Sequence, residues 1–195
     1  ASTTFNGIVS GAGGLTVGIA PSTGALTLTN ENTYTGATTV ESGTLFLGNA
    51  NTLADSGAVV VNGTLDLMST DETIGSLAGN GTGAVQLNGN TLTVAGTGTA
   101  ATTDFNGVID GTGKLVVNNG TDTLRLGGVN THTGGTDVEG GTLALTGTGA
   151  LANVNLNDGA FQTAGTVSGT ATIAGGIKTV TGGTVTTATN TNGVQ

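Results

Sequence analysis

The sequence contains no cysteine and no tryptophan, and only one proline among its 195 residues. Without cysteine, the chain can form neither a disulfide framework nor a thiolate metal site. The single proline and the absence of a three-residue glycine period exclude collagen. Aromatic residues make up only 3% of the chain and charged residues only 8%.

Basic residues are especially scarce. Three Lys and Arg stand against twelve Asp and Glu, which gives a formal net charge of −9. Binding to nucleic acid requires clustered Lys or Arg, so this balance argues against a nucleic-acid partner, and equally against an electrostatic hold on anionic lipid. The longest uninterrupted apolar run, residues 58–61, is far too short to span a bilayer. We therefore expect no membrane insertion by this segment.

Glycine and threonine dominate instead, with 38 and 42 residues. Both are poor helix formers, which excludes a coiled coil or a helical bundle. Hydrophobic residues still make up 35% of the chain and fall in short patterned runs, so a disordered tail is not expected either.

The chain contains two copies of a unit close to 100 residues long, approximately 3–101 and 102–195, which we expect to form a single domain over 1–195. Three segments of the first copy return in the second: Phe5–Val9 as Phe105–Ile109, Asn32–Gly36 as Asn130–Gly134, and Val40–Leu47 as Val138–Leu145. Such internal repeats are the hallmark of repeat architectures.

Each copy also contains short triplets in which a variable residue stands between two apolar ones, as in Leu15–Val17, Leu26–Leu28, Leu65–Leu67 and Leu143–Leu145. This alternation is typical of a strand with one buried face. Gly, Asn, Thr and Asp separate the triplets and favour tight turns. We therefore predict an all-β, three-sided parallel β-solenoid with roughly 20 residues per turn and about 10 turns.

The solenoid also accounts for the scarcity of charge. Equivalent side chains in successive turns lie about 4.8 Å apart, so like charges would repel along the stack. Thr and Asn can form hydrogen-bonded ladders on the outside, while Leu, Val and Ile fill the narrow interior.

Residues 24–45 resemble the autotransporter-associated β-strand repeat, residues 123–145 carry the motif again, and residues 73–83 resemble the stretch that often follows it. In that family the motif marks passenger regions of secreted or surface-held Gram-negative proteins that fold as right-handed parallel β-helices. The resemblance implies a rod and an export route, with an extracellular or cell-surface location in a Gram-negative bacterium. It does not imply an activity.

A catalytic β-helix would need two carboxyl groups that share a cleft, or a base supported by cations. The candidate acids are Asp55, Asp66, Asp71, Glu72, Asp104, Asp110, Asp122 and Asp137, with Asp71–Glu72 as the one adjacent pair. The three cations are Lys114, Arg125 and Lys178, and no two are adjacent in sequence. We expect these acids to lie at solvated turns and predict no catalytic residues.

His132, the single histidine, occupies the place of Tyr34 in the repeat, which favours a packing role in a turn. The nearest approach to a calcium motif, Gly135–Gly141, offers Asp137, where the first copy has Thr39. The glycine-rich segments 11–14 and 111–113 lack the ending of a phosphate-binding loop. We predict no metal site and no cofactor.

These observations predict a structural or adhesive extracellular β-helix. The alternatives are a carbohydrate-processing enzyme of the lyase or glycosidase type and a toxin-like passenger. The expected partners are a host or matrix surface and other copies of the chain, stacked head to tail into filaments, because neither end of the coil carries a recognisable cap.

Overall fold

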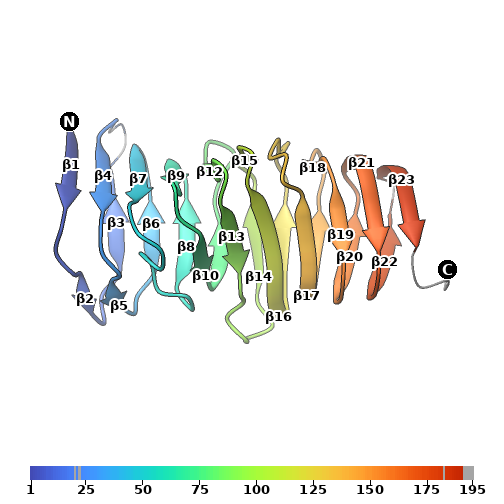
Figure 1. Cartoon of the computed structure of the whole chain (residues 1–195), viewed down its shortest axis with the longest axis horizontal. Helices are drawn as coiled ribbons and strands as arrows, with labels where there is room; N and C mark the ends of the chain where they lie inside the picture. The colour runs from blue at the N-terminus through green and yellow to red at the C-terminus, as the bar shows by residue number, and fades with distance from the viewer. Residues whose placement is uncertain (20, 22, 182, 191–195) are drawn as a thin grey trace.

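The computed structural model describes residues 1–19, 21, 23–181 and 183–190, which form one elongated rod with β1 and β23 at opposite ends (Figure 1). Every strand pairing in this part of the chain is parallel, and none of it is helical. Among these residues no helix is long and apolar enough to cross a membrane. The chain is thus an all-β parallel solenoid, as the alternating triplets predict.

Most strands are two to four residues long, because glycine-rich turns interrupt the chain at each corner. The described residues contain β1 (Ser2–Phe5), β2 (Ser10–Gly11), β3 (Leu15–Val17), β4 (Ala25–Leu28), β5 (Thr33–Tyr34), β6 (Thr38–Val40), β7 (Thr44–Leu47), β8 (Ala58–Val61), β9 (Thr64–Asp66), β10 (Glu72–Ile74), β11 (Ser76–Ala78), β12 (Ala84–Gln86), β13 (Thr91–Val94), β14 (Thr102–Phe105), β15 (Val108–Asp110), β16 (Lys114–Leu126), β17 (Thr136–Leu145), β18 (Ala150–Leu151), β19 (Val154–Leu156), β20 (Ala160–Thr163), β21 (Thr166–Ile173), β22 (Ile177–Val180) and β23 (Thr184–Asn190).

The strands stack into three faces that run along the rod (Figure 1). Face 1 begins with β1, β4, β7, β9, β12 and β15, in that order. Face 2 holds β2 and β5 and, further along, β10 and β13. Face 3 begins with β3, β6, β8 and β11. Each strand therefore pairs with the strand of the neighbouring coil and not with its neighbour in sequence.

Later strands bend around a corner and serve two faces. Residues 114–117 of β16 pair with β13 on face 2, and residues 123–126 pair with β14. A bridge between Gly79 and Phe105 joins β14 to the end of β11, so β14 continues face 3. β17 follows β16 in the same way.

The core is a set of columns that run along the inside of the coil. On face 1, Val85 pairs with Leu65 on one side and Ile109 on the other, and all three side chains are fully buried. The residues that follow them in the chain point outward, because successive side chains of a strand face opposite ways. Stacking the coils thus buries a continuous apolar interior that no single coil could bury alone.

One corner of the rod is a column of glycines, each directly before a face 1 strand. A Cβ on Gly107 would lie 2.1 Å from the carbonyl oxygen of Gly83, and one on Gly165 would lie 1.9 Å from that of Gly149. No side chain fits at these distances, so close stacking of the coils requires glycine here. The column contains Gly24, Gly43, Gly63, Gly83, Gly107, Gly128, Gly149, Gly165 and Gly183.

The two copies of the repeat do not lie directly above one another. Phe5 in β1 belongs to face 1, whereas its counterpart Phe105 in β14 belongs to face 3. On face 1, β15 lies five turns after β1, and β14 comes one face before β15. One repeat therefore spans four and two-thirds turns. This is why the rod has about 9 turns and not the predicted 10.

Candidate functional site

Two of the candidate acids, Asp66 and Asp71, hold turns in place. Asp66 accepts hydrogen bonds from the backbone N–H of Met68 at 2.7 Å and from the amide of Asn88 in the next coil at 2.8 Å. Asp71 accepts one from the backbone N–H of Thr91, also 2.7 Å away in the next coil. These carboxylates replace the strand pairing that the turns lack.

Asp122 secures an exposed loop at the junction of the two copies. Its carboxylate accepts hydrogen bonds from the backbone N–H and the hydroxyl of Thr97, at 2.5 and 2.8 Å, and from the N–H of Ala101 at 3.0 Å. Burial alone would raise the pKa of Asp122, but these hydrogen bonds outweigh it and lower the pKa. The carboxyl is therefore held ionised in a structural role.

Glu72 lies inside the rod and not at a solvated turn, contrary to our expectation. It is 2% exposed, and its carboxylate accepts hydrogen bonds from the backbone N–H groups of Thr52, at 2.9 Å, and Leu53, at 3.1 Å. Burial raises its pKa to about 7 despite these bonds, and Asp55 adds to the rise. Its sequence neighbour Asp71 points outward, because adjacent strand residues face opposite sides.

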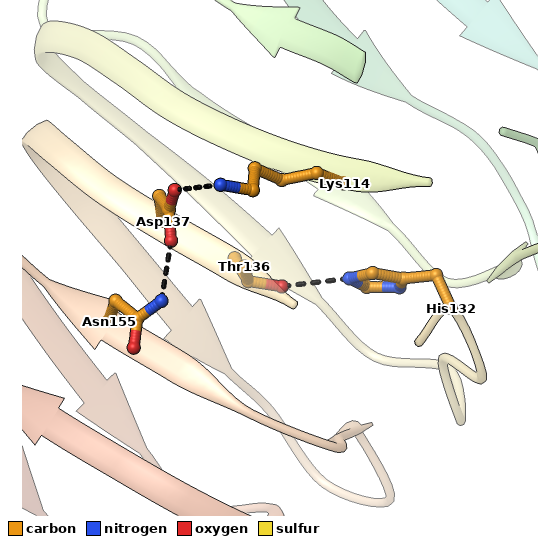
Figure 2. Close-up of polar contacts among 5 residues, drawn as sticks. All are labelled: Lys114, His132, Thr136, Asp137 and Asn155. Atoms are coloured by element: carbon orange, nitrogen blue, oxygen red, sulfur yellow. Dashed lines mark hydrogen bonds and ion pairs between the residues drawn. The ribbon is translucent and has the colours of Figure 1, made fainter. Parts of the chain in front are cut away.

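Asp137 also has both carboxylate oxygens occupied (Figure 2). Lys114 donates to one oxygen at 2.7 Å from the preceding coil, and Asn155 donates to the other at 2.7 Å from the following coil. The hydrogen bond to Asp137 raises the pKa of Lys114. The segment Gly135–Gly141 thus uses its carboxylate as a link across three coils.

The remaining candidate acids do not gather into a catalytic pair. Asp104 faces Arg125 at 3.8 Å across β14 and β16, and both side chains are about half exposed. Asp110 lies in the outward column of face 1, next to Gln86. Nowhere in the described part of the chain do three or more His, Asp or Glu side chains cluster as they would around a metal ion.

His132 is buried, with 1% of its surface exposed, and its Nε2 lies 2.9 Å from the hydroxyl of Thr136 (Figure 2). Tyr34 is buried in the same way, and its hydroxyl lies 2.5 Å from that of Thr38. Either ring therefore fills the same interior position and bonds to the threonine four residues later. Burial lowers the pKa of His132, so the imidazole is neutral.

Sequence reasoning missed a pair of buried asparagines. Asn32 and Asn130 are 3% and 4% exposed and occupy equivalent places in the two copies. Asn32 bonds to Val9, Asn30 and Thr52, so it links three coils where strand pairing is interrupted. The repeated Asn-Thr-aromatic-Thr-Gly turn was the signal for these residues, because a polar residue kept in both copies needs a partner.

A shallow groove lies at the glycine corner between faces 3 and 1. Its volume is about 480 Å³, and it is wide open to solvent. Asn62 lines the groove, where it donates to Glu41 at 3.1 Å and accepts from the N–H of Asn80 at 3.1 Å. The lining is small and polar: Thr23, Glu41, Ser42, Gly43, Thr44, Asn62, Gly63, Thr64 and Thr82. This shape suits surface contact better than enclosure of a small molecule.

Comparisons with known proteins agree with this architecture. The family model of the passenger-associated-transport-repeat matches residues 22–47 and 116–145, the segments that contain β4 to β7 and most of β16 and β17. The Adhesin BmaC autotransporter of Brucella suis biovar 1 (strain 1330) is 40% identical over 161 residues, which cover 82% of this chain. The same match covers only 4% of the length of that adhesin. No solved structure matches the chain. The repeat motifs, the parallel solenoid and the adhesin relative together show that the chain belongs to the autotransporter passenger repeat family.

Proposed function

We propose that this chain is an adhesive, non-enzymatic segment of a passenger exposed on the surface of a Gram-negative bacterium. The observation that carries the proposal is the 40% identity to an autotransporter adhesin over 82% of the chain. The relative is far longer than this chain, so adhesion is proposed here for the segment and not taken over from the relative.

The outer surface of the rod supports adhesion. The outward column of face 3 runs through Thr16, Thr39, Val60 and Ala78, and resumes after the Gly79–Phe105 bridge. Its two charged residues in the next coils, Asp104 and Arg125, face each other. Because most of these side chains are small and uncharged, they give a flat face on which a partner can make many weak contacts along the rod.

The positions of the acidic side chains argue against catalysis. Asp66, Asp71, Asp122 and Asp137 accept hydrogen bonds from the turns and coils beside them, and Glu72 is sealed in the core. A lyase or glycosidase would need carboxyl groups that face substrate. We therefore propose that the acids of this chain are structural.

The test uses beads coated with the purified chain and applied to cultured mammalian cells and to immobilised extracellular matrix. Beads coated at equal density with the heat-unfolded chain are the control. We expect several-fold more attachment of the folded chain, with little change as salt is raised, because few exposed charges contribute. Equal attachment of both bead types would contradict adhesion. Release of reducing sugar or unsaturated uronate from polysaccharides would contradict the non-enzymatic role.

Head-to-tail stacking of separate chains stays a prediction. Electron micrographs of concentrated material test it: long fibres of uniform width would support stacking, and dispersed short rods would contradict it.

A further inference from the structure

Three segments of the chain carry the acceptor sequence for N-linked sugars, in which an asparagine is followed by any residue except proline and then by threonine. They are residues 62–64, 80–82 and 119–121. Such triplets arise easily in a chain rich in Asn, Gly and Thr, so the sequence alone does not distinguish among them. The structure does, because a sugar requires an accessible amide nitrogen with open space around it.

The middle triplet forms an exposed turn. Asn80, Gly81 and Thr82 are all exposed and lead from β11 to β12. The side chain of Asn80 accepts a hydrogen bond from the backbone N–H of Thr82 at 2.9 Å, and the hydroxyl of Thr82 lies 2.6 Å from the same oxygen. Because a backbone N–H can only donate, the amide atom that faces Thr82 is the oxygen Oδ1.

The other amide atom of Asn80, the nitrogen Nδ2, is not used by the fold. Within the part of the chain that the structure describes, this nitrogen has no hydrogen-bond partner. The turn requires only Oδ1, which an aspartate would supply equally well. A Cβ on Gly81 would have its nearest neighbour, the carbonyl oxygen of Asn106, 3.9 Å away, so the turn stands clear of the next coil. The turn therefore has room for a bulky group on Nδ2.

Asn62 is the opposite case, because both ends of its amide are occupied. Its Nδ2 donates to Glu41 in the preceding coil and its Oδ1 accepts from the N–H of Asn80 in the following coil, both at 3.1 Å. The next residue, Gly63, lies in the glycine corner, where a Cβ would be 2.7 Å from the carbonyl oxygen of Gly43. A sugar on Asn62 would therefore break a link across three coils.

Asn119 has no space for a sugar. It is 2% exposed, and a Cβ on Gly141 in the next coil would lie 1.9 Å from its Oδ1. A sugar attached before folding would keep the coils apart at this point. Of the three asparagines, Asn80 is thus the one whose modification is compatible with the folded rod, whether the sugar is attached before or after folding.

We propose that Asn80 is an N-glycosylation site. The donor is a sugar activated as a phosphate ester, and a transferase catalyses the step. Nδ2 of Asn80 attacks the anomeric carbon of the sugar, the C–O bond to phosphate breaks, and the phosphate leaves with the electron pair. A base of the transferase accepts one amide proton. The product is still an amide, so Oδ1 continues to hold the turn.

The position of Asn80 gives the sugar a role on the surface. The sugar would lie beside the groove at the glycine corner, because Asn62 and Thr82 both line that groove and both contact Asn80. Exposed turns of small residues are preferred sites of proteolytic cleavage. A bulky, hydrophilic sugar at this turn would shield it from proteases.

The first test uses the purified chain, a soluble transferase specific for Asn-X-Thr, and uridine diphosphate glucose. Mass spectrometry of peptides, with fragmentation that keeps the sugar attached, measures the rate at each asparagine. In the folded chain we expect Asn80 to react at least about tenfold faster than Asn62 or Asn119, because the other two require local opening of the rod. Synthetic peptides of the three segments are the control, and their rates should agree within a few-fold. Equal rates in the folded chain, or no sugar on Asn80, would overturn the proposal.

Matched variants separate modification from folding. Asn80→Asp keeps Oδ1 but has no amide nitrogen, so it should lose the sugar and melt at the temperature of the unmodified parent. Thr82→Ser keeps the hydroxyl and should retain the sugar, whereas Thr82→Val should lose it. A sugar that persists on this segment in Asn80→Asp would overturn the assignment to Asn80.

The second test asks whether the step occurs in the bacterium that exports the protein. The protein is isolated from these cells and its peptides are mapped by the same method. We expect a sugar on the peptide that contains Asn80 and none on those that contain Asn62 or Asn119. A single hexose would indicate a nucleotide-activated donor, and a larger oligosaccharide would indicate a lipid-linked donor. Unmodified Asn80 in this material would overturn the proposal, whatever the purified transferase does.

Discussion

The side chain of Asn32 accepts a hydrogen bond from the backbone N–H of Val9, 2.8 Å away in the preceding coil. Its amide group donates to the carbonyl oxygens of Asn30, at 2.8 Å, and Thr52, at 2.9 Å. In the second copy, Asn130 makes the same three bonds, to Ile109, Gly128 and Ala150, at 2.9, 3.0 and 3.1 Å. One buried amide therefore satisfies three backbone groups at each of two corners.

Replacing Asn32 or Asn130 with Ala should destabilise the rod. Each change leaves buried backbone groups without partners, so we expect the free energy of unfolding to fall by about 1–3 kcal/mol. Urea unfolding followed by circular dichroism measures the loss. Asn30→Ala is the control, because that side chain bonds at an exposed position, and its effect should be smaller. Equal losses for all three variants would show that burial of the amide is not the cause.

His132→Tyr should leave stability at neutral pH nearly unchanged, since Tyr34 fills the equivalent position and bonds to Thr38. The variant should differ from the parent in acid. Burial lowers the pKa of His132 below 6.5, so protonation favours the unfolded chain and stability is lost as the pH falls below that value. Thermal melts from pH 7 to pH 5 should show a smaller loss in the tyrosine variant. A large loss at pH 7 would contradict the packing role.

Glu72 should give the opposite dependence on pH. Its pKa is about 7 in the folded chain, against 4.5 for an ordinary glutamate, so the folded state binds the proton more tightly. The contribution of Glu72 to the free energy of unfolding is therefore greatest below pH 4.5. It falls by up to about 3 kcal/mol as the pH rises toward 7. Glu72→Gln should abolish this slope, and melts of the two chains between pH 4.5 and 7.5 compare them. Parallel curves for both chains would show that Glu72 does not titrate in this range.

The glycine corner should tolerate no side chain. In Gly107→Ala, the new Cβ would meet the carbonyl oxygen of Gly83 at 2.1 Å, so the coils must separate locally. We expect a loss of about 2 kcal/mol or more in the free energy of unfolding. Gly81→Ala is the control, because the nearest atom to a Cβ there would be 3.9 Å away, and its effect should stay within about 0.5 kcal/mol. Similar losses for both would indicate that glycine acts only through the flexibility of the unfolded chain.

The sequence predicted the coil well because period-two triplets such as Leu65–Leu67 report burial directly. It did not predict the rotation between copies. The repeat of Phe5 at Phe105 gives the length of the unit, but whether that length makes five turns or four and two-thirds depends on how many residues each corner takes up. The number of residues between paired positions varies along the rod, from 24 for Ala84 with Val108 to 16 for Ala150 with Thr166, and no local sequence pattern predicts this variation.

The acids show a second limit of prediction from the sequence. Asp71 and Glu72 look alike as an adjacent pair, yet one points to solvent and the other into the core. The inward direction of Glu72 depends on the N–H groups of Thr52 and Leu53, one coil away, which donate to its carboxylate and which only the folded structure brings close. The glycine column is different, because the glycine before each face 1 strand from β4 onward is visible in the sequence once the turns are aligned.

Adhesion along the length of the rod is the central claim, and a shortened rod tests it most directly. Deleting residues 35–132 joins Tyr34 to Thr133, so Thr136–Val138 should stack on β3 in place of β6. The deletion removes one repeat, or four and two-thirds turns, and circular dichroism and a thermal melt establish that the shortened rod is folded. Beads coated with equal numbers of shortened and full rods are then applied to the same cells. We predict that attachment falls to half or less, since the number of contacts scales with length and linked contacts reinforce one another. Attachment that is unchanged while the rod remains folded would contradict distributed contact and point to a single local site.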